Sequence, residues 1–311
     1  RPPRSTPLYS SAASDVYKRQ VLNMIGFFAA ISAVLFWTFS CSIWRKESEN
    51  LLPRQINIYK NVLASILFLP VVLTISWLSN MSSIFVLIIS GIVGISIGDT
   101  LYINALKIIG TRKTLSFEAL TPIIATTLGT WSIDEIYPQK VWVGSLIVSF
   151  SLLMIVRQNT FQKEEPRERN ILGILCAFGS VLCAVLAALL SRLILIGSTL
   201  TPLQTTEIRL LSASIFLFLI FKKDFFDILN NRELTKKNHS NLILSTLLGT
   251  NFGILFQQIV FKFLPIGIGW TLLSLSPVFA LFISKREGEE INKLTIFYSF
   301  LSFIGVAITL I

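Results

Sequence analysis

The feature that most constrains this chain is a series of long apolar runs separated by short polar segments. A run of about 20 apolar residues, rising 1.5 Å each, crosses the ~30 Å hydrocarbon core of a bilayer. We therefore predict an all-α membrane protein with ten transmembrane helices. A soluble helical protein is the alternative, but only 14% of the residues are charged, against about 25% in soluble domains. The runs lie near 24–43, 56–78, 83–108, 114–133, 140–156, 171–195, 203–221, 241–264, 266–284 and 294–311.

Two of these runs contain a proline in the same context. "EALTPIIA" begins at Glu118 and "LSLSPVFA" at Leu273, so that Pro122 and Pro277 lie 155 residues apart. The same shift pairs other residues in the third and eighth runs, and a shift of 149 aligns the second run with the seventh. Because the order of the matches is preserved, we predict a duplicated five-helix unit. The matches include Gly94 with Gly249, Gly98 with Gly253 and Lys60 with Arg209.

The predicted units span residues 24–156 and 171–311, and a polar linker at 157–170 joins them. Since five is odd, the second unit enters the membrane upside down relative to the first. Basic residues agree, because they concentrate in the loops after odd-numbered runs, which the positive-inside rule places in the cytoplasm. Inverted repeats favour a transporter with two near-equivalent states and a substrate site near the midplane, between the repeats.

The first 23 residues differ from the rest of the chain. They hold no apolar run, and Met24 is the first methionine. We expect residues 1–23 to form a disordered or non-native tail.

The prolines suggest where a transport pathway lies. Proline lacks an N–H, so Pro122 leaves the carbonyl of Glu118 without its helical donor, and Pro277 does the same to Leu273. Lipid offers no partner for such groups, so they should face other helices or a wet cavity. Glu118 is therefore a candidate for lining the pathway and binding a proton. The alternative is an ordinary packing kink, with Glu118 reaching toward the helix end.

A second carboxylate, Asp99, lies deeper in an apolar run, where insertion costs roughly 2.5–3.5 kcal/mol. Asp99 is either a second proton-binding group or the structural partner of a cation. Lys60 and Arg209 occupy matching places in the second and seventh runs, as interfacial anchors or as contacts for an anionic substrate. Ile254 and Leu273 stand where Asp99 and Glu118 do in the first unit, so any proton coupling would be asymmetric, or absent with facilitated exchange instead.

Other polar and aromatic residues inside the runs are costly in lipid and are expected to line the pathway. Tryptophans near run ends are more typical of interfacial anchors; these are Trp44, Trp77, Trp131 and Trp142. The expected lining residues are Trp37, Asn104, Asn251, Gln257, Trp270 and Ser274.

Enzyme chemistry has little support in this sequence. The single histidine, His239, lies in a polar segment, and no phosphate-binding glycine loop is present. We expect no catalytic residues, metal or cofactor, and the net charge of +10 is spread over short loops rather than forming a nucleic-acid surface. A membrane enzyme or carrier-lipid handling protein remains the alternative, in which loop cations bind headgroups or phosphates.

The arrangement over residues 24–311 resembles the EamA-type members of the drug/metabolite transporter superfamily. The resemblance rests on two five-helix units, basic Lys60 and Arg209, glycine-rich third and eighth helices, and a small-residue–proline motif in the fourth and ninth. It implies a secondary transporter of a bacterial inner membrane, often an exporter of amino acids or other small metabolites. Its partners would be that metabolite, the lipid bilayer and protons. Helices 1, 3, 4, 6, 8 and 9 would line a central cavity, which carries over Glu118, Asn104, Asn251, Gln257, Trp270 and Ser274 as pathway residues.

Overall fold

The computed structural model describes residues 8–157, 167–230, 236–284 and 292–310, and within these ranges the chain is helical, with no strand. The α-helices are α1 (Leu8–Glu47), α2 (Pro53–Phe68), α3 (Met81–Gly91), α4 (Asp99–Phe117), α5 (Thr121–Ser132), α6 (Gln139–Arg157), α7 (Arg167–Gly197), α8 (Pro202–Asn230), α9 (Lys236–Ser245), α10 (Gly253–Phe263), α11 (Ile266–Leu273), α12 (Ser276–Ser284) and α13 (Lys293–Leu310). Short 3₁₀ segments are η1 (Leu69–Thr74), η2 (Leu78–Asn80) and η4 (Glu118–Leu120), and π-helical segments are η3 (Ile92–Gly98) and η5 (Thr246–Phe252).

Seven helices among the described residues are long and apolar enough to cross a membrane. The predicted fifth and ninth runs coincide with shorter apolar helices, Gln139–Ile155 and Ile266–Leu281. The predicted fourth run is divided among the end of α4, η4 and α5. It begins just after Gly110, whose φ of 80° is a backbone conformation that favours glycine. Ten spans therefore remain a prediction, while the described residues form an all-helical fold with seven helices of membrane-crossing length.

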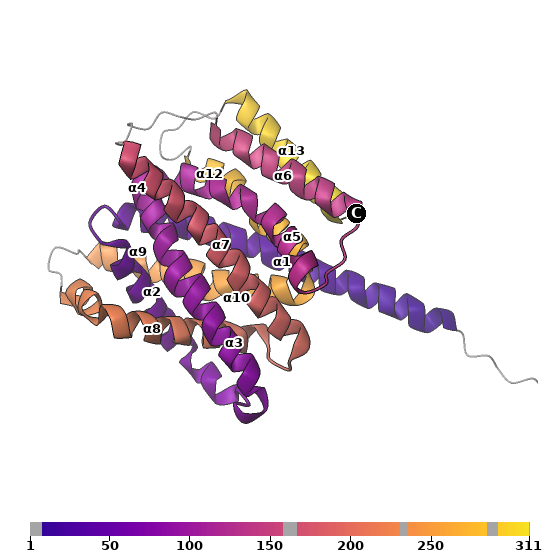
Figure 1. Cartoon of the computed structure of the whole chain (residues 1–311), viewed down its shortest axis with the longest axis horizontal. Coiled ribbons are helices and arrows are strands. Elements are labelled where there is room, and N and C mark those ends of the chain that lie inside the picture. Colours follow the sequence, from indigo (N-terminus) through magenta and orange to yellow (C-terminus); the bar gives the residue numbers. More distant parts are fainter. Residues whose placement is uncertain (1–7, 158–166, 231–235, 285–291, 311) are drawn as a thin grey trace, which may run out of the picture.

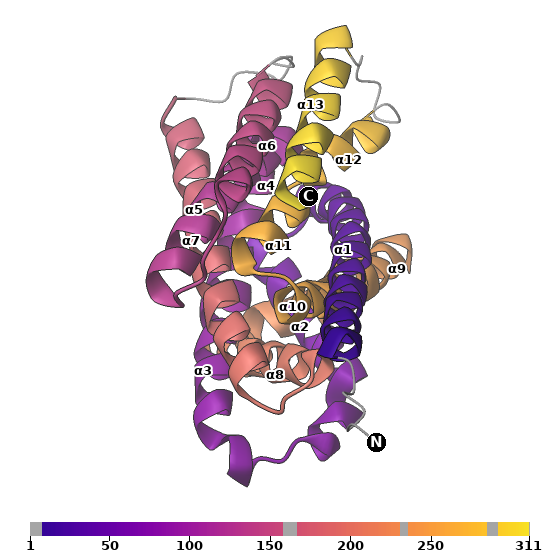
Figure 2. The same cartoon turned by 90° about the vertical axis from the view of Figure 1, so that its right-hand side faces the viewer.

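The largest helix contacts each join one helix of the first repeat to one helix of the second. Helix α4 lies against α7 and α1 lies against α10, while α2 packs on α8 and α6 packs on α13. Figure 1 shows α6 and α13 side by side along one edge of the molecule, with α2 and α8 at the opposite edge. Figure 2 shows α1 and α7 on either side of α10 and α11. Helices from both repeats thus surround the centre of the molecule.

The π-helical segments occupy corresponding places in the third and eighth runs. In each, a glycine permits two helices to touch: a Cβ on Gly94 would lie 2.6 Å from Ala187 Cβ, and one on Gly249 would lie 2.5 Å from Ser40 Cβ. Small residues at helix contacts allow this close approach. Gly94 and Gly249 therefore have a packing role.

Hydrogen bonds at the ends of these runs also repeat. Lys107 Nζ donates to the Leu51 carbonyl at 3.3 Å, and Lys262 Nζ donates to the Leu200 carbonyl at 3.4 Å. Both pairs follow the shifts of 155 and 149 found in the sequence. The two repeats therefore share polar contacts as well as apolar packing.

Contacts between the repeats occur at both ends of the bundle. At one end, Glu47 accepts hydrogen bonds from Asn238 at 2.7 Å and Asn241 at 3.1 Å, and Arg54 pairs with Asp224 at 3.0 Å. The loop after the first run thus lies beside the loop after the seventh.

At the other end, Glu135 accepts hydrogen bonds from Arg192 Nε and from the Ile266 N–H, both at 2.9 Å. The neighbouring Tyr137 hydroxyl donates to Glu135 and accepts from the Gly267 N–H at 3.0 Å. The loop after the fourth run is therefore joined to the junction of the eighth and ninth.

Three details differ from the sequence-based expectations. Helix α1 begins at Leu8, so residues 8–23 are helical, which contradicts the disordered alternative and leaves a non-native tail as a prediction; residues 1–7 lie outside the described ranges. Most of the predicted linker, 158–166, also lies outside them, and α7 already begins at Arg167. His239 lies in the first turns of α9 rather than in a loop.

The expectation for Trp44 was also wrong. Its side chain is buried, with 1% exposed, and its ring lies 5.1 Å from Lys60 Nζ. Trp44 is buried because it packs in an apolar cluster that includes Cys41, Leu51 and Ile56. Trp131 and Trp77 are 83% and 39% exposed, as interfacial anchors would be.

Candidate functional site

A cavity of about 100 Å³ lies between the two repeats, with room for several water molecules. Its walls come from the first, third, fourth, sixth, eighth and ninth runs, and in addition from Arg209 of the seventh. The lining residues are Ala33, Val34, Trp37, Gly94, Ile95, Gly98, Asp99, Tyr102, Glu118, Thr121, Ser180, Val181, Ala184, Arg209, Gly253, Ile254, Gln257, Trp270, Leu273 and Ser276.

The lining repeats the internal duplication of the chain. Sixteen of these twenty residues fall into eight pairs, one member from each repeat. A constant shift of 147 relates three pairs from α1 and α7, and a shift of 155 relates the other five. The cavity is therefore built from matched positions of the two repeats. The pairs are 33/180, 34/181, 37/184, 98/253, 99/254, 102/257, 118/273 and 121/276.

The two residues of a pair often differ in charge or polarity. Repeat one contributes Asp99 and Glu118 where repeat two has Ile254 and Leu273. It also contributes Trp37 where repeat two has an alanine. The shape of the cavity is thus shared by both repeats, while most of its ionisable and aromatic groups come from the first.

Glu118 is the carboxyl in this cavity that has no cationic partner among the described residues. Its Oε1 accepts hydrogen bonds from Trp37 Nε1 at 3.3 Å and from the Tyr102 hydroxyl at 2.9 Å. Both donors are neutral, and Cys41 Sγ lies 3.4 Å from the Tyr102 hydroxyl behind them. A carboxyl held this way keeps its position whether or not it carries a proton.

The two prolines are buried, and the hydroxyl residue before each explains the repeated motif. Thr121 Oγ1 donates to the Glu118 carbonyl, and Ser276 Oγ donates to the Leu273 carbonyl at 3.2 Å. Pro122 and Pro277 remove the helical N–H that would otherwise bond these carbonyls, although the Glu118 carbonyl also accepts the Thr121 N–H in the 3₁₀ segment. Each kink thus supplies its own replacement donor, and both hydroxyl residues line the cavity.

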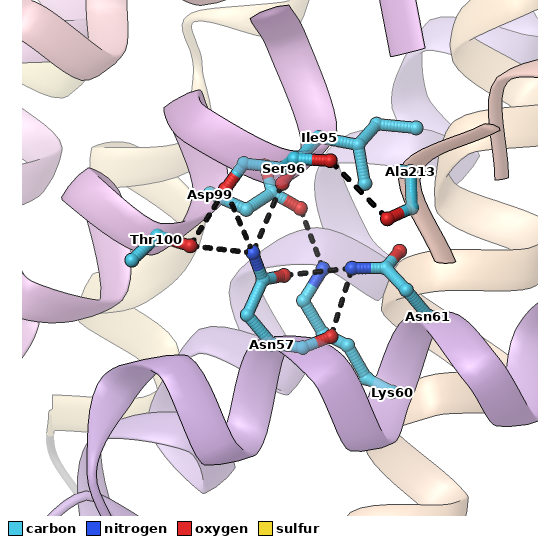
Figure 3. A network of polar contacts seen from close by, with 8 residues as sticks. All are labelled: Asn57, Lys60, Asn61, Ile95, Ser96, Asp99, Thr100 and Ala213. Carbon is cyan, nitrogen blue, oxygen red and sulfur yellow. Dashed lines mark hydrogen bonds and ion pairs between the residues drawn. The ribbon is translucent and has the colours of Figure 1, made fainter. Parts of the chain in front are cut away.

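Asp99 is held by a buried ion pair. Lys60 Nζ donates to Asp99 Oδ2 at 2.5 Å, and the side chains of Lys60 and Asp99 are 1% and 15% exposed (Figure 3). Lys60 also lies over the Trp44 ring. Of the two roles considered for Asp99, the structure shows the structural partner of a cation, and Lys60 is not an interfacial anchor.

A polar network around η3 supports this pair (Figure 3). Asn57 Nδ2 lies 3.0 Å from the Ile95 carbonyl, 3.1 Å from the Ser96 carbonyl and 2.8 Å from Thr100 Oγ1. A π-helical segment changes the regular hydrogen-bond ladder and occurs frequently at functional sites. Sequence analysis did not select Asn57, although its place three residues before Lys60 puts both on one helix face.

Arg209 is buried, with 4% exposed, and its side chain lines the cavity. Its Nε and Nη1 have no hydrogen-bond partner among the described residues. An interfacial position, which the sequence allowed, is therefore wrong for this residue.

The relationship to known proteins rests on the sequence as a whole. The family model described as "EamA-like transporter family" matches residues 24–157 and 171–311. The chain belongs to the EamA-like transporter family. Like other members of the family, it is an integral, multi-pass membrane protein and a transporter of the drug/metabolite type. A search of curated proteins finds no match.

The fold of this EamA-family chain is similar to that of a solved structure titled "Crystal structure of protein". The TM-score is 0.70 with 12% sequence identity, and the match covers 91% of this chain and 95% of that one. At this identity the similarity concerns the fold alone.

The residues expected to line the pathway of the transporter divide into two groups. Trp37, Glu118, Gln257 and Trp270 line the cavity, together with Asp99. The others lie outside its lining. Asn104 Nδ2 lies 3.7 Å from Cys176 Sγ and Asn251 Nδ2 donates to the Ala64 carbonyl at 3.0 Å, both on other helices, while Ser274 Oγ donates to the Thr271 carbonyl of its own helix at 3.0 Å.

Tyr102 was missed by the sequence analysis. The available signal was its position three residues after Asp99, on the same helix face, and its match with Gln257 under the shift of 155.

No group of three or more His, Cys, Asp or Glu side chains that could hold a metal ion occurs in the described part of this family member.

Proposed function

We propose that this EamA-family transporter carries a small polar metabolite through the cavity by alternating access, using protons as the coupling ion. The observation that carries this proposal is the position of Glu118, an ionisable group inside a cavity built from matched positions of the two repeats. Sites near the midplane at a repeat interface are typical of secondary transporters.

Inverted repeats would give the two near-equivalent states of alternating access, and the contacts at both ends support an inverted second repeat. Glu47 and Arg54, beside the first loop of repeat one, contact α9 and α8 around the second loop of repeat two. Glu135, in the fourth loop of repeat one, contacts Ile266 beside the third loop of repeat two. Parallel repeats would instead place first loops beside first or third loops.

Glu118 is the better of the two candidate carboxylates for proton coupling. Asp99 is already bound by the Lys60 ammonium group at 2.5 Å. Glu118 has the neutral donors Trp37, Tyr102 and Ser276 beside it, and no described cation forms an ion pair with it. A proton can therefore enter and leave Glu118 without breaking an ion pair.

The proposal includes a direction and a location of transport, which the family resemblance and the charge pattern support. We assign export of metabolites such as amino acids across a bacterial inner membrane, with the basic loops after odd-numbered runs in the cytoplasm. These assignments rest on the proposed transport function.

The test is counterflow in proteoliposomes containing the purified full chain. Labelled amino acids and other small polar metabolites are screened for exchange, and a pH gradient is then imposed. We expect Glu118→Gln to retain exchange but to lose accumulation driven by the pH gradient, while Glu49→Gln, at an exposed residue, behaves as wild type. Accumulation by Glu118→Gln at the wild-type level would exclude Glu118 as the proton site.

The same experiment separates the alternative function. A membrane enzyme or carrier-lipid handling protein would show no counterflow of any solute. Turnover or flipping of a labelled carrier lipid in the same vesicles, without solute exchange, would support that alternative and exclude the transporter.

A further inference from the structure

The buried cations of the two repeats differ in their carboxylate partners. Lys60 and Arg209 occupy matching positions, and so do Asp99 and Ile254. In repeat one, Asp99 binds Lys60 at 2.5 Å. In repeat two, the corresponding place holds the apolar Ile254, so Arg209 has no carboxylate from its own repeat.

Arg209 also differs from most other lining residues, because its counterpart in the other repeat does not line the cavity. It is the lining residue of the seventh run, and this counterpart is Lys60. A Cβ on Gly94 would lie 3.1 Å from Arg209 Nη2, so this glycine leaves room for the guanidinium. The guanidinium is thus placed at the cavity wall.

The polar groups of this guanidinium are incompletely satisfied. The side chain is 4% exposed, and its Nε and Nη1 have no partner among the described residues. Asp99 also lines the cavity, but Lys60 already binds its Oδ2. Buried charges in proteins are normally paired and hydrogen-bonded, because an unpaired one loses its hydration without compensation.

We infer that Arg209 binds a carboxylate group of the transported solute, which takes the place that Asp99 has beside Lys60. This inference rests on the proposed transport function, since it treats the cavity as the solute site. Guanidinium donors match the planar geometry of a carboxylate.

The surroundings favour a monoanion with an apolar or aromatic body. Asp99 and Glu118 also line the cavity, so a phosphate dianion would meet two carboxyl groups beside one free cation. Ile254, Leu273 and Trp270 supply apolar surface in the same cavity. A carboxylate on a small apolar or aromatic skeleton therefore fits this lining better than a phosphate.

The first test compares ligands that differ only in charge. The purified full chain in detergent is titrated at constant ionic strength with butyrate against butyramide, and with 3-phenylpropionate against 3-phenylpropanamide. We expect the better carboxylate to bind about tenfold or more tightly than its amide, because hydrogen bonds to charged groups are the stronger ones. Equal affinity of each acid and its amide would overturn the inference, and tighter binding of inorganic phosphate would overturn the assignment of a carboxylate.

Substitutions of Arg209 test whether this residue binds the carboxylate. Arg209→Gln should abolish the preference for carboxylate over amide, and Arg209→Lys should retain part of it because the charge remains. Arg54→Gln is the matched control, since Arg54 is an exposed arginine with 48% of its side chain accessible. An unchanged preference in folded Arg209→Gln would contradict the inference.

A variant of Ile254 tests the same idea in the opposite direction. Ile254→Asp supplies the carboxylate that repeat two lacks, so it should raise the melting temperature relative to Ile254→Asn and remove carboxylate binding. Carboxylate binding by Ile254→Asp equal to that of Ile254→Asn would show that Arg209 is not the anion site.

The outcomes separate this inference from the proposed function. Carboxylate binding that depends on Arg209, without counterflow in proteoliposomes, would support the anion site and contradict transport. Counterflow of solutes that lack a carboxylate, at equal rates in wild type and Arg209→Gln, would support transport and contradict the anion site.

Discussion

Lys60 Nζ lies 2.5 Å from Asp99 Oδ2, and this ion pair joins α2 to α4 within the first repeat. Lys60 is 1% exposed, so removal of the carboxylate leaves a buried charge without compensation. We expect Asp99→Ala to lower the free energy of unfolding by about 3–5 kcal/mol. The measurement is denaturant or SDS-induced unfolding of the purified protein in micelles.

The paired replacement Lys60→Met with Asp99→Leu is the control for this prediction. Removing both charges should recover most of the lost stability, because apolar substitutes for a buried ion pair are often neutral. Arg54→Gln, which breaks the exposed pair with Asp224, should cost less than about 1 kcal/mol. A double variant as unstable as Asp99→Ala would show that the loss has another cause.

The helix contacts at the two matched glycines give a second prediction. A Cβ at Gly94 would lie 2.6 Å from Ala187 Cβ, and one at Gly249 would lie 2.5 Å from Ser40 Cβ. Both alanine variants should therefore be destabilised by about 1–3 kcal/mol through overpacking. Gly197→Ala is the control, because nothing lies within 4 Å of its added Cβ. The measurement is the melting temperature of each of the three variants relative to wild type. A Gly94→Ala variant as stable as Gly197→Ala would argue against tight packing of η3 on α7.

The sequence predicted the repeat well because the duplicated positions carry unusual residues. Pro122 and Pro277 interrupt apolar runs, and glycines recur four residues apart before Asp99 and Ile254. Such residues are conspicuous in an apolar background, so their order reveals the duplication. The same contrast selected Trp37, Glu118 and Gln257, which line the cavity.

The remainder of the site depends on side-chain directions that spacing does not determine. Asn251 and Asn104 are as polar as Gln257, yet Asn251 donates to the Ala64 carbonyl and Asn104 faces Cys176. Because each helix packs against several neighbours, a polar side chain can satisfy a backbone group of a neighbour instead of facing the cavity. The kink at η3 further rotates the residues that follow it, so their faces do not follow from a regular helical period.

The hydroxyl residues before the prolines give a third prediction. Thr121 and Ser276 donate to the carbonyls that lose their helical N–H donor to the prolines. Ser276→Ala should cost about 1–3 kcal/mol, the penalty for leaving a buried acceptor unsatisfied. Thr121→Val should cost less, because the Thr121 N–H still bonds the Glu118 carbonyl. Thr127→Val is the control, since Thr127 is exposed and donates to the Ile123 carbonyl within a regular helix. Equal losses of unfolding free energy in Ser276→Ala and Thr127→Val would contradict the role assigned to the hydroxyl.

The cluster at the end of the bundle gives a pH-dependent prediction. Tyr137, in the loop between α5 and α6, is hydrogen-bonded to Glu135 and to the Gly267 N–H. Burial, followed by the hydrogen bond to Glu135, raises the pKa of Tyr137 above its ordinary value of 10.0. The folded state thus favours the neutral phenol, so its contribution to stability is complete below pH 10 and is lost as pH rises above that value.

Tyr137→Phe removes both the hydrogen bonds and this titration. We expect it to cost about 1–2 kcal/mol at pH 8, because Glu135 loses a donor and the Gly267 N–H loses its acceptor. Between pH 9 and 11 the melting temperature of wild type should fall more steeply than that of the variant. Parallel curves over this range would mean that Tyr137 is free to ionise in the folded protein, and would contradict its burial between the two repeats.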